Sequence, residues 1–280
     1  MTAQAPSPEI VTYTADLSIC SQICRLVLEE HQLAGIRDVE VDIEYTMENY
    51  EAWFVRIQPK MTVPVMQYDG LYVGDSKEIM YFVAQRHSQL GLYPPAYRGP
   101  IDAFIDDFYN HFRLVGAFTF GHLQVQHGEP MQRFVRRAKT TVTTAKLRAL
   151  LRQPEFETAA RARLEQIAQR DLARMTEPGI LTRADRAMTK LLAAAQTQLA
   201  RGGGPWLMGP AYTLADVVAT ALLARIHLIK GQAMFTPPLI KYWERLQARP
   251  SFRSASVCST WDDTAMSVHF AAFSKDSAAC

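Results

Sequence analysis

The chain has 280 residues, of which 48% are hydrophobic and 21% are charged, and its 30 basic and 28 acidic side chains give a net charge of +2. This composition is typical of a globular protein, and it excludes largely disordered chains and small disulfide-dependent ones. A net charge this close to zero also provides no global field to attract nucleic acid or acidic membranes.

The four cysteines, Cys20, Cys24, Cys258 and Cys280, have neither metal-ligand spacing nor the regular spacing of a disulfide framework. We therefore expect reduced thiols, no metal site and a cytoplasmic location. The first ten residues lack the basic and apolar regions of a signal peptide, and no apolar run reaches the roughly 18 residues of a membrane span. The sequence thus predicts no membrane partner.

The first ninety-odd residues alternate between strand and helix patterns, which predicts an α/β domain over residues 1–93. The strand patterns lie at residues 10–14, 39–43, 63–68 and 71–73. Asp69-Gly70 separates the last two strands and favours a tight hairpin turn, so that pair is predicted to be antiparallel and the sheet mixed.

Two helices are predicted in this part of the chain. Residues 18–33 carry an apolar stripe at steps of three and four, and Gly35 is expected to end that helix. A second helix is predicted from Ser76 to about His87, with Ser76 as its N-cap. Cys20 therefore lies at the start of the first helix.

The second half of the chain is predicted to be all-helical. Strand patterns disappear after the proline-rich residues 92–100, and we place a domain boundary there, with a helical domain over residues 100–280. Thr213 and Asp216 have the spacing of a capping box, in which the hydroxyl accepts the amide of Asp216 and the carboxylate reaches back to the amide of Thr213.

Residues 131–190 are basic, with 14 Lys and Arg against six Asp and Glu. Solvated helical faces explain this excess more simply than an anion-binding or nucleic-acid surface does. Phe134 and Phe156 are the only aromatic residues there, which is sparse for base stacking. We expect no nucleic-acid partner.

Cys20 is the side chain that most clearly suggests chemistry. Unpaired amides and the helix dipole at a helix start stabilise an anion, so a thiolate is favoured there. A thiolate at neutral pH is a nucleophile, and a small packing residue is the alternative interpretation. Cys24 follows one turn later with CxxxC spacing, not the redox CxxC, and is predicted to be a core residue.

Val63-Pro64 opens a predicted strand, where proline is tolerated only if its missing amide lies outside the ladder. We expect a cis bond here, with the backbone of Val63 exposed as a short edge to which a peptide-like ligand can pair. Asp75-Ser76 follows at a helix start, where a hydroxyl and free amides suit a ligand carboxylate, with plain N-capping as the ordinary alternative.

The order of these features resembles the glutathione transferase superfamily. It comprises a cysteine-headed helix (SICSQICRLVLEE), a Val-Pro strand (QPKMTVPVM), a DG hairpin, DS at a helix start and TLAD in a helical half. SICS followed by arginine, together with ENYEAWFVRIQPK, most resembles the glutathione-dependent reductive dehalogenases of chlorinated hydroquinones, which are relatives of the zeta class that contains maleylacetoacetate isomerase. The resemblance implies a thioredoxin-like N-terminal domain, an all-helical C-terminal domain and a homodimer.

The resemblance also implies roles for single residues. Cys20 matches the catalytic cysteine and Ser18 the serine two positions before it. Thr213 and Asp216 match the motif that starts the central helix of the helical domain, which is a structural role.

The resemblance further implies that glutathione is held by five residues. The backbone of Val63 pairs with the cysteinyl part, and Pro64 is the cis-proline. Asp75 and Ser76 match the acid-serine pair that holds the γ-glutamyl end. Lys60 lies where a basic side chain meets the glycine carboxylate.

Three departures from the family pattern bear on the site. The usual Asn-Pro-x-Gly loop is Gln58-Pro59-Lys60-Met61, so no glycine supplies a positive φ. The usual glutamate is Asp75, which is one methylene shorter. Ile19 replaces the second serine of the zeta class, which weakens the case for an identical isomerase.

The function that the resemblance implies is reductive dehalogenation of a halogenated hydroquinone, through a glutathionyl conjugate and an enzyme-glutathione mixed disulfide. Isomerisation of a maleyl dioxo acid and thiol transfer are sibling alternatives, and a non-catalytic binding protein on the same fold is a further one. His111, Arg113 and His122 lie in the segment that lines the second substrate's pocket in the resembling fold. Each of them is explained more simply as a surface or helix-packing residue.

Overall fold

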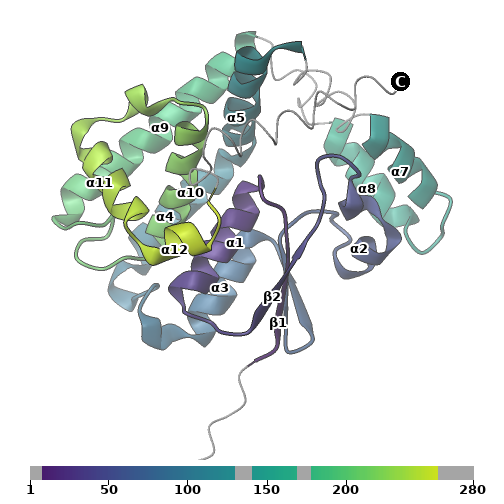
Figure 1. Cartoon of the computed structure of the whole chain (residues 1–280), viewed down its shortest axis with the longest axis horizontal. Helices are drawn as coiled ribbons and strands as arrows, with labels where there is room; N and C mark the ends of the chain where they lie inside the picture. The colour runs from purple at the N-terminus through teal and green to yellow at the C-terminus, as the bar shows by residue number, and fades with distance from the viewer. Residues whose placement is uncertain (1–7, 130–140, 169–177, 258–280) are drawn as a thin grey trace, which may run out of the picture.

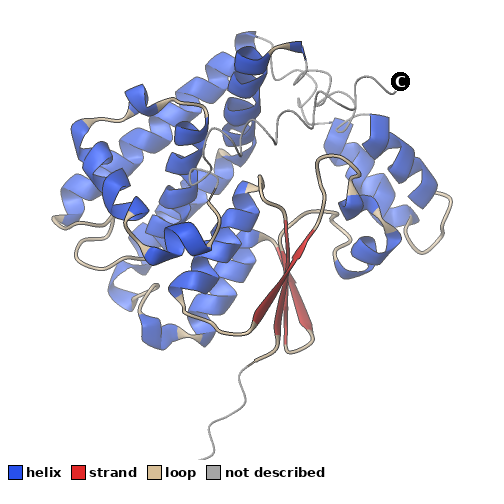
Figure 2. Cartoon of the chain, in the orientation of Figure 1, coloured by secondary structure: helices blue, strands red, loops and turns tan. Residues whose placement is uncertain are grey.

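The computed structural model describes residues 8–129, 141–168 and 178–257. One four-stranded sheet lies beside a large group of helices, and helices account for most of the structure (Figures 1 and 2). In these ranges no helix combines the length and the apolar character that a membrane crossing requires.

The sheet has the order β2-β1-β3-β4. Its strands are β1 (Ile10–Thr14), β2 (Ile36–Glu40), β3 (Val65–Tyr68) and β4 (Leu71–Gly74). β2 runs parallel to β1, while β3 is antiparallel to both of its neighbours. The predicted mixed sheet and the Asp69-Gly70 hairpin are both confirmed.

The predicted position of the second strand, 39–43, is wrong by three residues. β2 pairs with β1 so that the carboxylate of Asp38 accepts hydrogen bonds from the hydroxyls of Thr12 (2.6 Å) and Thr14 (2.9 Å). Asp42 ends the extended segment, because its carboxylate accepts the amides of three residues in the following turn, which are Glu44, Tyr45 and Thr46. The hydrogen bonds between β1 and β2 therefore set the position of β2, which the alternation of apolar and polar residues did not predict correctly.

Two predicted helix boundaries are also corrected. Helix α1 (Ile19–Glu30) ends before Gly35, because the ring of His31 hydrogen-bonds the carbonyl of Val27 at 2.6 Å and Gln32 adopts a left-handed conformation. Helix α3 (Ser76–Arg86) begins where expected, but its N-cap is Asp75 and not Ser76. The carboxylate of Asp75 accepts the amide of Lys77 at 3.0 Å.

From residue 98 onward the regular structure is helical. The longer helices are α4 (Arg98–Asn110), α5 (Phe112–His127), α7 (Thr143–Leu150), α8 (Glu157–Ala168), α9 (Pro178–Gly202), α10 (Leu214–Leu228), α11 (Pro237–Gln247) and α12 (Pro250–Ser254). α10 is apolar on all sides and is buried along nearly its whole length, as its sequence LADVVATALLARIHL requires. The predicted fold class, an α/β unit joined to an all-helical one, is confirmed.

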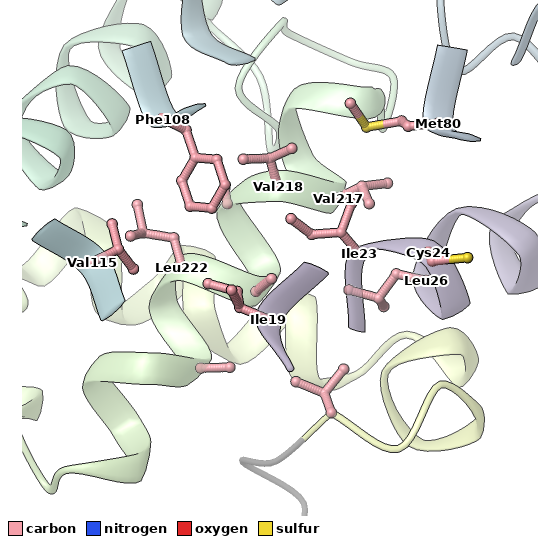
Figure 3. Close-up of a cluster of buried hydrophobic side chains, with 14 of the residues drawn as sticks. Ile19, Ile23, Cys24, Leu26, Met80, Phe108, Val115, Val217, Val218 and Leu222 are labelled. Atoms are coloured by element: carbon pink, nitrogen blue, oxygen red, sulfur yellow. The ribbon is translucent and has the colours of Figure 1, made fainter. Parts of the chain in front are cut away.

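The two halves share one hydrophobic core (Figure 3). Ile23 of α1 and Met80 of α3 lie in the same buried cluster as Phe108 of α4 and Val217 of α10. Cys24 is fully buried in this cluster, so its prediction as a core residue is confirmed. The position of α1 therefore depends on helices from the other half of the chain.

The start of α10 is held by the buried carboxylate of Asp216. It accepts the amides of Thr213 and Leu207, both at 2.9 Å, and the hydroxyls of Thr213 at 3.0 Å and Tyr242 at 2.7 Å. The predicted capping box forms, and its carboxylate also ties α11 and the segment before α10 to the same point. One side chain thus anchors three segments.

Asp216→Ala is expected to lower the free energy of unfolding by at least about 3 kcal/mol, because four buried donors lose their acceptor together with the cap. Urea denaturation of the whole chain measures the change. Asp185→Ala is the control, because Asp185 forms a half-exposed pair with His122 that is worth less than about 1 kcal/mol. Equal losses in the two variants would contradict the anchoring role of Asp216.

Candidate active site

Cys20 lies in the first turn of α1, as the sequence predicted. The hydroxyl of Ser18 caps this helix by accepting the amide of Ser21 at 3.2 Å. Cys20 is a free thiol and is partly exposed. The structure gives Ser18 a capping role, and its direct part in chemistry remains a proposal.

Two hydroxyl groups connect Cys20 to the helical half. The Ser76 hydroxyl at the start of α3 lies close enough to the Cys20 thiol to lower its pKa. It also lies 2.7 Å from the hydroxyl of Tyr109 on α4. Burial and the nearby thiol raise the pKa of Tyr109 well above its usual value, so Tyr109 keeps its proton, and either hydroxyl of the pair can donate to the other. The three side chains form a continuous chain across three helices.

A buried positive charge lies close to the same thiol. Arg225 of α10 is 4% exposed, and its guanidinium donates to the carbonyl of Leu17 at 2.6 Å and to the side chain of Gln22 at 3.1 Å. Its Nε has no hydrogen-bond partner, and Arg225 forms no ion pair with any residue in the described ranges. This charge therefore remains available to an anion at Cys20.

The expected thiolate at neutral pH is not what the structure supports. Although Cys20 is partly exposed, its surroundings are densely packed, and this burial, together with the nearby carboxylate of Asp75, raises the pKa of the Cys20 thiol to about 12. The Ser76 hydroxyl and the charge of Arg225 lower the pKa of Cys20, but they do not offset the loss of solvent. The helix start alone is thus insufficient to ionise this thiol.

The segment before β3 has the predicted backbone form. The Val63-Pro64 peptide bond is cis, and Val63 makes no backbone hydrogen bond within the described part of the chain. Met61 adopts a φ of +54° where the family pattern has glycine. Lys60 is exposed, and its ammonium group has no partner among the described residues.

Asp75 and Ser76 point in different directions. Asp75 is exposed and has a φ of +79°, a strained value for a residue with a side chain. Ser76 is fully buried, and its hydroxyl is directed to Tyr109 and Cys20. The structure thus brings Ser76 to Cys20, whereas the sequence predicted that it would face the ligand.

The histidines predicted from the helical half contact residues other than Cys20 and Ser76. His111 contacts its own helix through Asp107, and His122 pairs with Asp185 of α9 at 2.8 Å. Arg113 is exposed, while Cys258 and Cys280 lie outside the described residues. The described residues include no group of three or more potential metal ligands.

Sequence reasoning missed Tyr109 and Arg225. Tyr109 lies in an ordinary amphipathic helix and Arg225 in an apolar one, and neither belongs to a motif. An arginine within an otherwise apolar helix was the one available signal, because a buried charge requires a reason.

Comparison with known proteins shows similarity over most of the chain. The family models of the glutathione S-transferase N-terminal and C-terminal domains match residues 17–86 and 182–254, which together are just over half of the chain. A tetrachloro-p-hydroquinone reductive dehalogenase from Sphingobium chlorophenolicum is 28% identical, with 91% of this chain and 98% of that protein covered.

One further curated protein and one solved structure are similar at lower identity, and the solved structure shows the fold alone. An Arabidopsis thaliana glutathione S-transferase TCHQD is 24% identical, with 86% of this chain and 87% of that protein covered. The crystal structure of beta-etherase LigF from Sphingobium superposes with a TM-score of 0.65 at 18% identity, with 88% of this chain and 98% of that chain covered.

The rate of Cys20 alkylation is expected to rise about tenfold per pH unit between pH 7 and 9, because a thiol with a pKa near 12 is almost wholly protonated there. Iodoacetamide labelling followed by mass spectrometry of the Cys20 peptide measures this rate, and Cys20→Ser corrects for labelling of other thiols. A plateau near pH 7 would contradict the raised pKa.

Tyr109→Phe is expected to slow alkylation of Cys20 at pH 8 by about threefold, because Ser76 loses the hydroxyl that supports its own donation to the sulfur. Tyr81→Phe is the matched control. It removes one hydroxyl from the same α3–α4 interface, but that hydroxyl donates to Asp102, which retains Tyr93 as a donor. Equal rates in the two variants would show that Tyr109 does not act on Cys20.

Proposed function

The chain belongs to the glutathione S-transferase family, and on that premise we propose that it is a glutathione-dependent reductive dehalogenase of halogenated hydroquinones with Cys20 as the nucleophile. The observation that carries the proposal is the position of Cys20 in the first turn of α1, beside the Ser76 hydroxyl and the charge of Arg225. The similarity to a hydroquinone dehalogenase over nearly the whole chain supports the choice of substrate class.

Glutathione would bind along the segment that ends in Val63. The unpaired backbone of Val63 suits the cysteinyl part of the tripeptide, as a strand edge pairs with a peptide. The exposed carboxylate of Asp75 would hold the γ-glutamyl ammonium group, and the unpartnered ammonium of Lys60 would meet the glycine carboxylate. Pro64 shapes this segment, and Ser76 follows Asp75 at the start of α3.

The first chemical step would form the conjugate. A halogenated hydroquinone tautomerises to an enone, whose halogen-bearing carbon is electrophilic. The glutathione thiolate attacks this carbon, halide leaves with the bonding electrons, and a glutathionyl hydroquinone results.

The second step would use Cys20. Its sulfur attacks the sulfur of the conjugate, the carbon-sulfur bond breaks, and the ring carbon takes the electron pair and one proton. A second glutathione then attacks the mixed disulfide and restores Cys20. The ring is reduced by two electrons, and two glutathione molecules become one glutathione disulfide.

A protonated Cys20 is consistent with this second step. The reaction needs a nucleophilic sulfur and also a proton for the departing carbon, and one thiol carries both. The hydroxyls of Ser76 and Tyr109, which are 2.7 Å apart, would pass that proton while the sulfur bond forms. Ser18 would fix the orientation of the first turn.

The alternatives differ in the steps after conjugate formation. A maleyl dioxo acid isomerase would release glutathione unchanged and a thiol transferase would use a disulfide substrate, so neither needs halide release. A non-catalytic binding protein would need no reactive thiol, and the contacts around Cys20 argue against it.

A homodimer in the cytoplasm is part of this proposal. Leu71 and Tyr72 of the edge strand β4 are 53% and 42% exposed, and a second copy that packs on this edge would cover part of their apolar surface. Sedimentation velocity of the whole chain distinguishes a dimer from a monomer.

Incubation of the reduced protein with glutathione disulfide at pH 8 is expected to add one glutathione to Cys20, and none at this position in Cys20→Ser. Intact mass and peptide mapping identify the adduct. Turnover with a chlorinated hydroquinone should then release halide and consume two glutathione molecules per ring reduced. Isomerised maleylacetoacetate without halide release would select the sibling activity, and failure to bind glutathione would select the binding protein.

A further inference from the structure

The loop that leads into Val63 contains an unfavourable backbone conformation. Met61 has a φ of +54°, in the left-handed region that disfavours residues with a Cβ atom. A residue persists in such a conformation only where its surroundings hold it. The contacts of Met61 therefore determine how the backbone of Val63 is presented.

Two polar side chains hold the Met61 carbonyl. The amide group of Asn49 donates to it at 2.8 Å, and the guanidinium of Arg163 donates to it at 3.4 Å. The Met61 amide donates to the carbonyl of Gln58 at 2.8 Å, and the methionine side chain is fully buried. The strained residue is thus fixed at its amide, its carbonyl and its side chain.

Arg163 comes from a distant part of the chain. It lies on α8 and is 6% exposed, and its Nε donates to the hydroxyl of Tyr50 at 3.2 Å. The guanidinium also lies over the Tyr50 ring, 5.7 Å from its centroid. No carboxylate pairs with Arg163 in the described ranges. Besides Tyr50 and the Met61 carbonyl, the guanidinium donates only to the side chain of Gln166 on its own helix, at 3.2 Å, among the contacts of the described residues.

Helices α7 and α8 form a pair that packs on this part of the α/β unit (Figure 1). Lys146 of α7 forms an ion pair with Glu51 at 2.5 Å, and Arg56 of α2 (Ala52–Ile57) pairs with Glu155 at 2.9 Å. Neither family model covers residues 143–168. Lys146, a basic side chain of the 131–190 stretch, thus helps to join the two halves.

We propose that Arg163 is a positioning residue for glutathione. Arg163 holds Met61 in its left-handed conformation, so that the Val63 backbone faces the tripeptide. This rests on the proposed function, because it assumes that glutathione pairs with Val63. Arg163 of the α7–α8 pair thus stabilises a positive φ at position 61 that a glycine would adopt without such support.

Arg163→Met is expected to raise the KM for glutathione about tenfold, because it removes a charged donor from the Met61 carbonyl. Cys20 alkylation in the absence of glutathione should be unchanged, because Arg163 does not contact the thiol. Arg163→Lys, which keeps the charge but loses the planar fork, should give a smaller rise. Arg161→Met is the matched control, because Arg161 lies on the same helix with its side chain 65% exposed.

The deciding measurement uses Met61→Gly, since glycine adopts a positive φ without penalty. In the Met61→Gly background, Arg163→Met should change the KM for glutathione by no more than about twofold. An equal tenfold rise in both backgrounds would show that Arg163 acts by some route other than the conformation of Met61, and would overturn the proposal.

Amide hydrogen exchange separates this proposal from the proposed function. Arg163→Met should speed exchange in peptides spanning residues 58–66 of the ligand-free chain, and it should not do so in the Met61→Gly background. If the wild-type chain binds no glutathione, the proposed function fails and the positioning role fails with it. If glutathione binds and exchange in 58–66 does not respond to Arg163→Met, only the positioning role is overturned.

Discussion

The structure depends on one buried carboxylate. The carboxylate of Asp216 accepts four hydrogen bonds, from the start of α10, from the segment before it and from α11, and these bonds partly offset the burial that raises the pKa of its carboxyl. They fix where α10 begins, and α10 is the helix on which the shared core is built. Because α1 packs on α10, the position of Cys20 follows from a cap far away in the sequence.

The candidate site is therefore assembled between the two halves. α1 supplies Cys20 and α3 supplies Ser76, while α4 and α10 of the helical half supply Tyr109 and Arg225. Burial and polar contacts act in opposite directions on the thiol, and burial prevails. A thiol that stays protonated until its sulfur reacts fits a step that needs a proton at carbon, which links the electrostatics of the site to the proposed reduction.

The proposed glutathione-binding edge has a similar dependence on distant contacts. Met61 and Asp75, the strained residues on either side of β3 and β4, are held by different means. Asp75 caps its own helix, whereas Met61 relies on Asn49 and on Arg163 of α8. Gln58 adds a further restraint, since its amide group lies so close to Gly74 that a Cβ there would be only 2.1 Å away. A loop without glycine keeps its shape because other parts of the chain enclose it.

The sequence by itself determined the features that depend on residues close together along the chain. The periods of the strands and helices, the hairpin at Asp69-Gly70, the cis bond at Pro64 and the capping box at Asp216 were all predictable. Only the tertiary structure decided the register of β2, the direction of the Ser76 hydroxyl, the pKa of Cys20 and the contacts of Tyr109, Arg225 and Arg163. Each of these depends on burial or on a partner tens of residues away, and local patterns do not record which distant side chains meet.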